Sequence, residues 1–270
     1  MTRAMTTHPV AEGVTFVEGP ASNWTVLVGD GEVALIDTGY PNDYALVEES
    51  IAAAGGAGLP VTTVLITHGH SDHIGCAGAM ARVHGARVFA HDAEIPNVRR
   101  DIVEQITLLD LLPSLWRPRV IRWAMHAIRS GGLDNVGVEE VRPLDGPLTV
   151  AGHRVVPIPT SGHTRGHTAF LLPDAAALAT GDALITAHPT VPDAGPQLLP
   201  DMFHADPHRA VVALGALASA QASVLLPGHG PLLRTDPFDA VDAARLSRLP
   251  DVPRPPIPTQ PLVWWRAGLG

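Results

Sequence analysis

Four side chains that can bind metals fall within six residues of this chain, directly after an apolar run. The stretch, which follows residues 61–66, reads Thr67-His68-Gly69-His70-Ser71-Asp72-His73. The run predicts a buried strand and the residues from Asp72 onward predict a helix, so these side chains lie on a strand-to-helix turn. Residues two apart in an extended segment project the same way, so His68 and His70 can share one ion while Asp72 and His73 turn toward a second.

Imidazole nitrogens with a carboxylate form a ligand set that suits zinc, with iron and manganese as alternatives. The plain alternative is a turn that is rich in histidine and binds no ion. We favour the metal site because clustered histidines contribute little to packing and are costly to bury without partners.

Three later segments could supply the further ligands that a pair of ions needs. Each follows or ends a short apolar run: SGHTRGHT at 161–168 follows 155–158, TGD at 180–182 follows 176–179, and PGHG at 227–230 follows 224–226.

The order of these motifs, HxHxDH, GHTxGH, GD and GHG, resembles the metallo-β-lactamase-fold hydrolase superfamily over roughly residues 14–249. The resemblance implies an α/β fold, a four-layer αβ/βα sandwich with the metals at one edge between its sheets. It also implies two divalent ions, with this ligand set: His68, His70 and His163 for the first, Asp72, His73 and His229 for the second, and Asp182 as the bridge.

Two further positions match the family without being ligands. Asp37, in the turn after residues 33–36, would orient ligand imidazoles through hydrogen bonds, although it could also be a plain turn aspartate. His167 is the second histidine of the GHTxGH motif, a position that is usually not a ligand, so we interpret it as a supporting or structural residue.

Length and composition restrict the classes of function. A chain of 270 residues with 46% hydrophobic content can bury a substantial core, and we expect a single domain over residues 1–249. Eighteen basic and 27 acidic residues give a formal charge of −9, which argues against a nucleic-acid surface.

A single cysteine, Cys76, excludes an intramolecular disulfide. We expect a cytoplasmic protein without a membrane partner, because residues 1–10 show no signal peptide and no run reaches the roughly 18 apolar residues of a membrane span.

Strands and helices alternate in the first part of the chain. We expect strands at 14–18, 24–28, 33–37, 61–66 and 87–90 and helices at 41–54 and 72–84, a first half that ends at residue 92. The second half should contain strands at 148–150, 154–158, 169–172 and 177–179. Its helices should start at Asp206-Pro207 and Asp236-Pro237, where an aspartate cap precedes a proline, on either side of the strand at 224–226.

Residues 93–135 change to helical spacing with proline interruptions, which predicts a helical insertion. In the family such segments shape the substrate pocket, so Leu112, Trp116 and Trp123 are candidate pocket residues; a helix pair packed on the sheet without ligand contact is the alternative. Residues 250–270 form a Pro/Trp-rich arm with Trp264 and Trp265, which we expect to pack on the insertion of its own subunit or of a partner in a homodimer.

A site with two divalent ions, two carboxylates and a hydroxide has a net charge of about +1 by formal counting and favours an oxyanion. The expected reaction is attack by a hydroxide that bridges the ions on a lactone, thioester or other carboxylic ester of a small molecule with an apolar part. Asp182 argues against a true β-lactamase, and the chain lacks an evident basic C-terminal domain like that of glyoxalase II. The alternatives are a phosphodiester or organophosphate hydrolase, a mononuclear iron dioxygenase of sulfur compounds, and a metal-binding protein without turnover.

His188 lies on the segment that leaves Asp182, and we expect it to stay near the metals. It could protonate the leaving group as a general acid, because histidine titrates near neutrality. The alternative is an exposed loop histidine. Tyr40 and Tyr44 are remote from this segment in the sequence.

Overall fold

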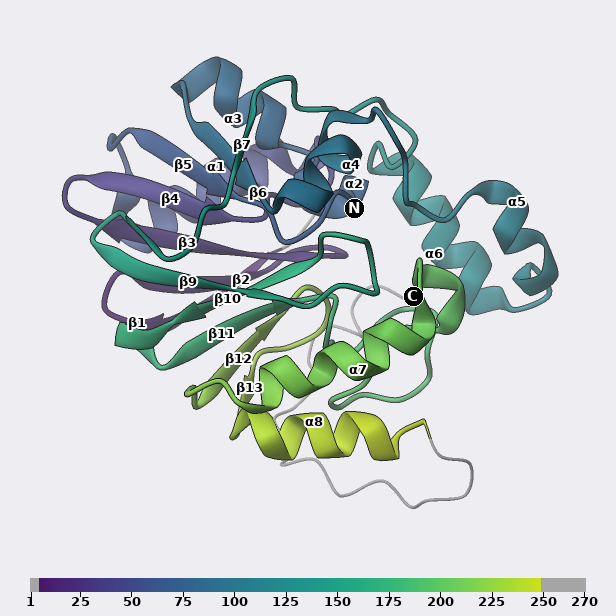
Figure 1. The fold of residues 1–270 in the computed structure, drawn as a ribbon. Helices are drawn as coiled ribbons and strands as arrows, with labels where there is room; N and C mark the ends of the chain where they lie inside the picture. Colours follow the sequence, from purple (N-terminus) through teal and green to yellow (C-terminus); the bar gives the residue numbers. More distant parts are fainter. Residues whose placement is uncertain (1–4, 249–270) are drawn as a thin grey trace.

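Two β-sheets lie face to face at the centre of the protein, with helices on both outer sides (Figure 1). The structure is a computed structural model that describes residues 5–248. The expected four-layer αβ/βα sandwich is confirmed.

The first sheet has seven strands in chain order: β1 (Thr6–Ala11), β2 (Val14–Glu18), β3 (Asn23–Gly29), β4 (Glu32–Ile36), β5 (Val61–Leu65), β6 (Arg87–Ala90) and β7 (Val141–Pro143). Strands β1 to β4 pair antiparallel, and β4 to β7 pair parallel. The parallel strands all end at the edge that carries the HxHxDH motif.

The second sheet has six strands in the order β13-β12-β11-β10-β9-β8. Their bounds are β8 (Leu148–Val150), β9 (His153–Pro159), β10 (Thr168–Leu172), β11 (Ala177–Gly181), β12 (Val224–Pro227) and β13 (Leu233–Arg234). All pairs are antiparallel except β11 with β12, so the segments after these two strands leave the sheet at the same edge.

Helices cover the outer face of each sheet (Figure 1). The first sheet carries α1 (Tyr44–Ile51) and α3 (Ala77–His84), and the second carries α7 (Pro207–Ala218) and α8 (Pro237–Leu246). The predicted starts of α7 and α8 are confirmed, because Asp206 accepts a hydrogen bond from the backbone N–H of Arg209 and Asp236 accepts one from that of Phe238. Short 3-10 turns precede α1 (Pro41–Asp43) and follow β10 (Pro173–Ala175), and a π-type turn (Ala52–Gly56) ends α1.

The apolar core between the sheets draws side chains from both. Phe16 and Leu27 of the first sheet share one buried cluster with Phe170 and Leu172 of the second. This packing holds the two sheets together and thereby fixes the loops at their common edge.

Several details differ from the sequence expectation, among them the short edge strand β13, which was not predicted. Strand β1 was not predicted because it is a short, half-exposed edge strand that contains Pro9 and few apolar residues. Strand β7 joins the first sheet after the insertion, so the first half does not end at residue 92. The helix expected at 72–84 is divided into α2 (Ser71–Ile74) and α3, because the backbone N–H of Gly75 donates to the carbonyl of Gly39 at 2.9 Å instead of continuing the helical ladder.

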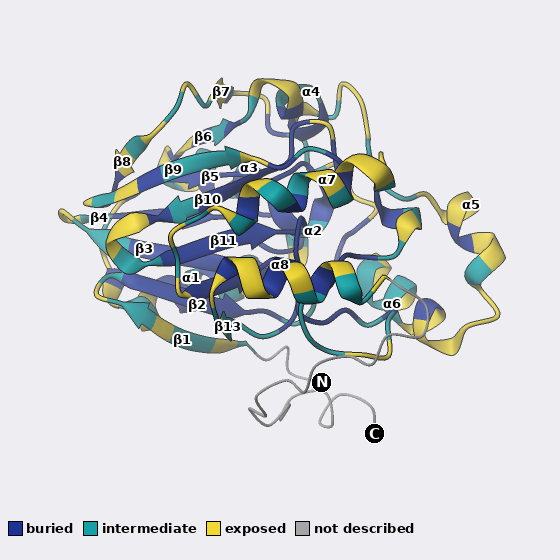
Figure 2. Ribbon diagram, turned by 60° about the horizontal axis from the view of Figure 1, so that its bottom comes forward, coloured by how far each residue is buried: buried dark blue, intermediate teal, exposed yellow. Residues whose placement is uncertain are grey.

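The expected helices between residues 93 and 135 are present, and the two longer stretches after residue 107 project from one end of the sandwich (Figure 1). They are a 3-10 turn (Asp92–Glu94), α4 (Ile95–Arg99), α5 (Leu108–Leu111), a 3-10 turn η4 (Leu112–Ser114) and α6 (Pro118–Arg129). Much of α5 is exposed (Figure 2). The Pro/Trp-rich arm lies outside the described residues, so its packing and the homodimer stay predictions.

Within residues 5–248, none of the helices has both the length and the apolar character that crossing a membrane requires.

Candidate metal centre

The motif residues meet at the edge of the sandwich where the strands that lead to them end. The HxHxDH loop follows β5, His163 follows β9, Asp182 follows β11 and His229 follows β12. Seven side chains form two groups that could each hold an ion: His68, His70, His163 and Asp182 in one, and Asp72, His73 and His229 in the other. These are the seven residues that the sequence motifs singled out.

In the first group, the ring nitrogens converge on one point. His163 Nε2 lies 3.2 Å from His68 Nε2 and 3.0 Å from His70 Nδ1. The Oδ2 atom of Asp182 is 3.4 Å from His163 Nε2 and 3.9 Å from His68 Nε2. A tetrahedral zinc site with bonds of about 2.05 Å has ligand–ligand edges of about 3.3 Å, so these separations fit a cation at the centre.

The second group has similar dimensions. His229 Nε2 lies 3.4 Å from Asp72 Oδ2 and 3.3 Å from Asp182 Oδ2, and His73 Nε2 lies 3.5 Å from Asp182 Oδ1. The carboxylate of Asp182 therefore faces both groups.

Two atoms of this cluster are buried without a hydrogen-bond partner. They are His73 Nε2 and Asp182 Oδ1. Buried polar atoms are rarely left unsatisfied, and each such atom is costly. A cation would satisfy both atoms at once, so the residues present fit a bound metal.

Asp37 fixes the ring orientation of one histidine in each group. Its Oδ2 accepts a hydrogen bond from His73 Nδ1 at 2.8 Å and another from the Thr67 hydroxyl at 2.7 Å. Because that hydroxyl donates to Asp37, its oxygen accepts from His68 Nδ1 at 3.0 Å. Both Nε2 atoms are thus left for an ion, in the supporting role expected for Asp37.

Backbone carbonyls hold two more rings. His229 Nδ1 donates to the carbonyl of Ala21 at 2.8 Å, and His70 Nε2 donates to that of Glu104 at 2.5 Å. His70 therefore presents Nδ1 to the site, and its carbonyl partner belongs to the helical insertion. The insertion thus contacts the candidate metal centre directly.

His204, which no sequence motif marks, supports the ring of His163. Its Nε2 donates to the carbonyl of Leu199 at 3.0 Å, so its Nδ1 accepts from His163 Nδ1 at 3.2 Å. Burial lowers the pKa of His204, which keeps this ring neutral and able to accept. The sequence offered no signal because His204 lies in an irregular segment far from every motif.

Glu94 links the HxHxDH loop to the GHTxGH loop by hydrogen bonds. It was not identified from the sequence. Its Oε1 accepts from the Gly69 backbone and the Asn97 amide, and its Oε2 accepts from the Thr164 hydroxyl and the Gly166 backbone, all at 2.7 or 2.8 Å. A fully buried carboxylate with four donors fixes the spacing of the loops that carry His70 and His163. Only the folded chain brings these donors together.

Charges within the cluster strongly perturb its titration. Burial alone would raise the pKa of Asp182, but His229 and His73 hold it well below the usual range. Burial alone would lower the pKa of His73, but Asp182, Asp72 and Asp37 raise it to about 9. Without an ion, protons on these histidines balance the carboxylates; a cation would take over that charge.

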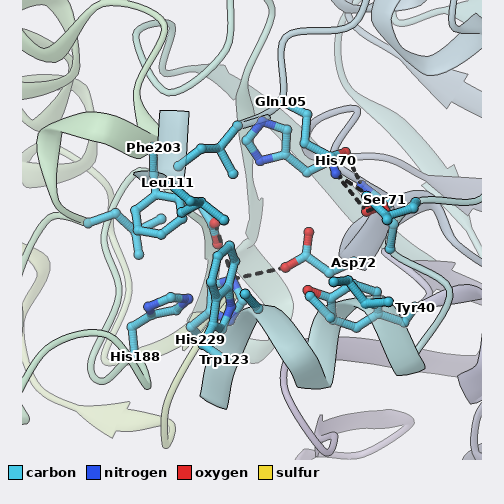
Figure 3. Close-up of a pocket in the computed structure, with 18 of the residues that line it drawn as sticks. Tyr40, His70, Ser71, Asp72, Gln105, Leu111, Trp123, His188, Phe203 and His229 are labelled. Atoms are coloured by element: carbon cyan, nitrogen blue, oxygen red, sulfur yellow. Dashed lines mark hydrogen bonds and ion pairs between the residues drawn. The ribbon is translucent and has the colours of Figure 1, made fainter. Parts of the chain in front are cut away.

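The cluster opens into a cavity that the insertion covers (Figure 3). Trp123 lines this cavity as expected, but the same expectation for Leu112 and Trp116 is wrong. These two side chains are 58% and 74% exposed, because η4 and the turn after it face solvent. The residues of α5 and α6 that turn inward take their place.

His188 lines the same cavity and is buried, so it is not an exposed loop histidine. Its ring centroid lies 4.9 Å from that of His229, and its Nδ1 accepts from the Thr190 hydroxyl at 2.7 Å. Burial and His229 lower the pKa of His188 to about 3, so in this environment the ring is neutral rather than charged. Its Nε2–H is left as a donor.

Tyr40 is a cavity residue that the sequence did not reveal. Figure 3 shows it next to Asp72, although 31 intervening residues separate the two in the chain. Burial, Asp72 and Asp43 raise the pKa of Tyr40, which keeps its phenol protonated.

Comparisons with known proteins agree with this geometry. A sequence profile described as "Metallo-beta-lactamase superfamily" matches residues 17–229. The Bacillus subtilis (strain 168) protein "Probable metallo-hydrolase YflN" is 27% identical over 205 residues, 73% of this chain and 74% of that protein. A "Hydroxyacylglutathione hydrolase" of Acidiphilium cryptum (strain JF-5) is 30% identical over 258 residues, 92% of this chain and 84% of that protein. The crystal structure of a metallo-beta-lactamase family protein from Thermus thermophilus has a TM-score of 0.59 and 26% identity, covering 88% of this chain and 77% of that one.

Proposed function

The chain belongs to the metallo-beta-lactamase superfamily of metallo-hydrolases, and from this premise we propose that it hydrolyses an ester-type bond with two divalent metal ions. The bond is a lactone, a thioester or another carboxylic ester of a small molecule. Zinc is the first choice for both ions, with iron or manganese as alternatives, because the ligands are imidazoles and carboxylates.

The position of Asp182 carries the proposal of a binuclear site. Its Oδ2 atom lies 3.4 Å from His163 Nε2 in one group and 3.3 Å from His229 Nε2 in the other. A carboxylate between two such groups is suited to bridging two cations. A mononuclear site would leave Asp72, His73 and His229 as a buried cluster without a clear purpose.

When bound, such an ion pair supplies an activated water that is hydroxide near neutral pH, and it polarises the scissile carbonyl. The residues of the chain hold the ligands in place: Asp37, His204 and the carbonyls of Ala21 and Glu104 each occupy the ring nitrogen that faces away from the site. The rings therefore need little reorganisation during turnover.

His188 is proposed to assist the leaving group. Its Nδ1 is occupied by Thr190, so Nε2–H can donate to a developing alkoxide or thiolate in the cavity. The neutral state of the ring favours hydrogen bonding over delivery of a proton from an imidazolium.

The name of one relative also supports hydrolysis of a thioester-type bond. The name of the Acidiphilium relative is that of a hydrolase of hydroxyacylglutathione, which belongs to the class of reaction proposed here. A cavity bounded by the cluster and by the insertion also fits a small molecule better than a polymer such as a nucleic acid.

The test is to load the protein with zinc, manganese or iron and assay it on lactones, thioesters, phosphodiesters and β-lactams. We expect two ions per chain and hydrolysis of esters or thioesters without oxygen uptake. One iron per chain with oxygen uptake would instead identify a dioxygenase, preferential cleavage of phosphodiesters would change the reaction class, and two bound ions without turnover would identify a metal-binding protein.

A further inference from the structure

Two kinds of side chain line the cavity above the candidate metal centre: the metal-binding residues of the cluster and a wall of hydrocarbon (Figure 3). The wall comes from the insertion and the segment near residue 203: Ile106, Leu108, Leu111, Trp123, Ile128 and Phe203. We infer that this wall binds an uncharged hydrocarbon chain of the substrate, so that neutral thioesters or esters are accepted and thioesters of charged thiols such as glutathione are not. This inference rests on the proposed hydrolysis and specifies its substrate.

Trp123 is the residue of this wall whose ring lies near both His188 and Phe203. Its ring centroid lies 5.1 Å from that of Phe203 in an edge-on arrangement and 5.8 Å from that of His188. Trp123 also packs with Ile106 against the buried side chains of Leu199 and Phe203. A chain that starts at the metals therefore meets an aromatic surface and then aliphatic side chains.

Within residues 5–248, no arginine lines the cavity, so apart from the metal centre itself no cationic side chain there is available to pair with a carboxylate of the substrate. The chain has no lysine. Four lie on α6 or directly before it, and all four are exposed: Arg117, Arg119, Arg122 and Arg129. Glutathione carries two carboxylates and one ammonium group. A carboxylate of glutathione that is buried against this wall would have no arginine partner there, which is costly.

A second hollow beyond the wall offers no better anion site. Gln105, Ile106 and Phe203 line both cavities, and Arg165 and Arg209 line only the outer one. Three carboxylates line the outer hollow as well: Glu104, Asp110 and Asp206. The guanidinium of Arg165 is already paired, with its Nε atom 2.5 Å from Glu104 Oε1. The outer hollow therefore has no excess of positive charge for an anionic thiol.

The reaction itself is ordinary hydrolysis. The bond between the acyl carbon and its oxygen or sulfur breaks, the oxygen of water becomes a carboxylate oxygen, and the leaving alkoxide or thiolate takes up a proton. The hydrocarbon chain is unchanged and serves only for recognition.

The deciding experiment measures binding with two thioethers that cannot be hydrolysed. S-octylglutathione and S-octyl-N-acetylcysteamine share the alkyl chain and the sulfur but differ in charge. We expect calorimetry on the zinc-loaded protein to show at least about tenfold tighter binding of the neutral thioether. Lengthening its chain from hexyl to decyl should tighten binding by about two- to fourfold per methylene. Equal or tighter binding of the glutathione thioether, or no dependence on chain length, would overturn the inference.

Two tryptophans of the insertion give a matched pair of variants. Trp123→Ala should remove most of the chain-length dependence, whereas Trp116→Ala, at a position that is exposed and outside the cavity, should leave it unchanged. If Trp123→Ala fails to fold, the binding measurements on the unmodified protein still decide the inference.

Kinetics on acyl thioesters of N-acetylcysteamine and of glutathione separate the proposed hydrolysis from the inference about the hydrocarbon wall. Chain-dependent binding without any hydrolysis refutes the proposed function alone, and hydrolysis without chain-dependent binding refutes this inference alone.

Discussion

The backbone N–H of Asp182 donates a hydrogen bond to Nε2 of His167 over 3.0 Å. The other ring nitrogen of His167 is engaged as well, by the Thr160 hydroxyl at 2.7 Å. His167 therefore has no free nitrogen for an ion, although its ring is buried beside the cluster. The second histidine of the GHTxGH motif positions the proposed bridging carboxylate through its main chain.

We accordingly expect His163→Ala and His167→Ala to fail in different ways. His163→Ala removes a proposed ligand, so the isolated protein should hold fewer than two ions and lose nearly all activity. His167→Ala should keep two ions but lower the free energy of unfolding by about 1–3 kcal/mol, because the Asp182 N–H loses its acceptor. Metal analysis and thermal unfolding of both variants check this, and the opposite order of metal loss would refute the assignment.

Asp182→Ala tests the bridge itself. The variant should fold, since the cores of the sheets lie elsewhere, but it should bind metal weakly and show little activity because one carboxylate serves both groups. Asp174→Ala, in an exposed turn, is the matched control and should behave like the unmodified protein. Two ions per chain with full turnover in Asp182→Ala would show that the ligand assignment is wrong.

The sequence predicts the core of this site well because ligand residues must have a particular chemistry at a particular spacing. His68, His70, Asp72 and His73 lie within one turn, and the strands before His163, Asp182 and His229 are short apolar runs. These features are local, so pattern reasoning finds them. The same reasoning finds most strands of both sheets.

What the sequence does not predict is decided by distant contacts. Tyr40 reaches the cavity because the turn that carries it packs on Gly75, and Glu94 meets donors from two other loops. Trp116 and Trp123 are both tryptophans of the insertion, so the sequence marks them equally as candidate pocket residues. Only Trp123 lines the cavity, because it lies on the side of α6 that faces inward, whereas Trp116 is exposed. No local pattern distinguishes these cases.

Glu94→Gln should destabilise the protein although it keeps the size of the side chain. The amide offers one acceptor where the carboxylate offers two, and its NH₂ group would face two of the four donors that Glu94 now accepts from. We expect a loss of about 1–3 kcal/mol in the free energy of unfolding, measured by denaturant titration. Glu140→Gln, at an exposed position, should change it little; equal effects would contradict the proposed network.

The metal-free protein should be most stable near pH 6.5. The pKa of His73 is raised to about 9, so its contribution is complete below its unfolded pKa of about 6.5 and is lost as the pH rises toward 9. The pKa values of His167 and His188 are lowered to about 3, so their contributions are lost as the pH falls below about 6.5.

Thermal unfolding in a chelator from pH 5 to pH 9 checks this expectation. The melting temperature should pass through a maximum and decline between pH 6.5 and 9. With zinc bound, the ion takes the place of the proton on His73, so the decline on the alkaline side should disappear. A melting temperature of the chelated protein that rises steadily to pH 9 would contradict the perturbed titration of His73.

His188 provides the test of how the leaving group is assisted. Thr190 fixes the ring by donating its hydroxyl proton to Nδ1, so the proposed donor is Nε2–H. His188→Ala should lower kcat by a factor of about 10 to 1000 while both metal ions stay bound, as expected for a positioned proton donor or hydrogen-bond donor. Thr190→Val removes only the hydroxyl that orients the ring, so its loss of kcat should be smaller. Because the lost Nε2–H would stabilise the developing alkoxide, esters with poor leaving groups should suffer more than those with good ones, measured as kcat on a series of aryl and alkyl esters. An unchanged kcat in His188→Ala, or an equal loss across that series, would assign His188 to packing against Trp123 and Phe203 instead.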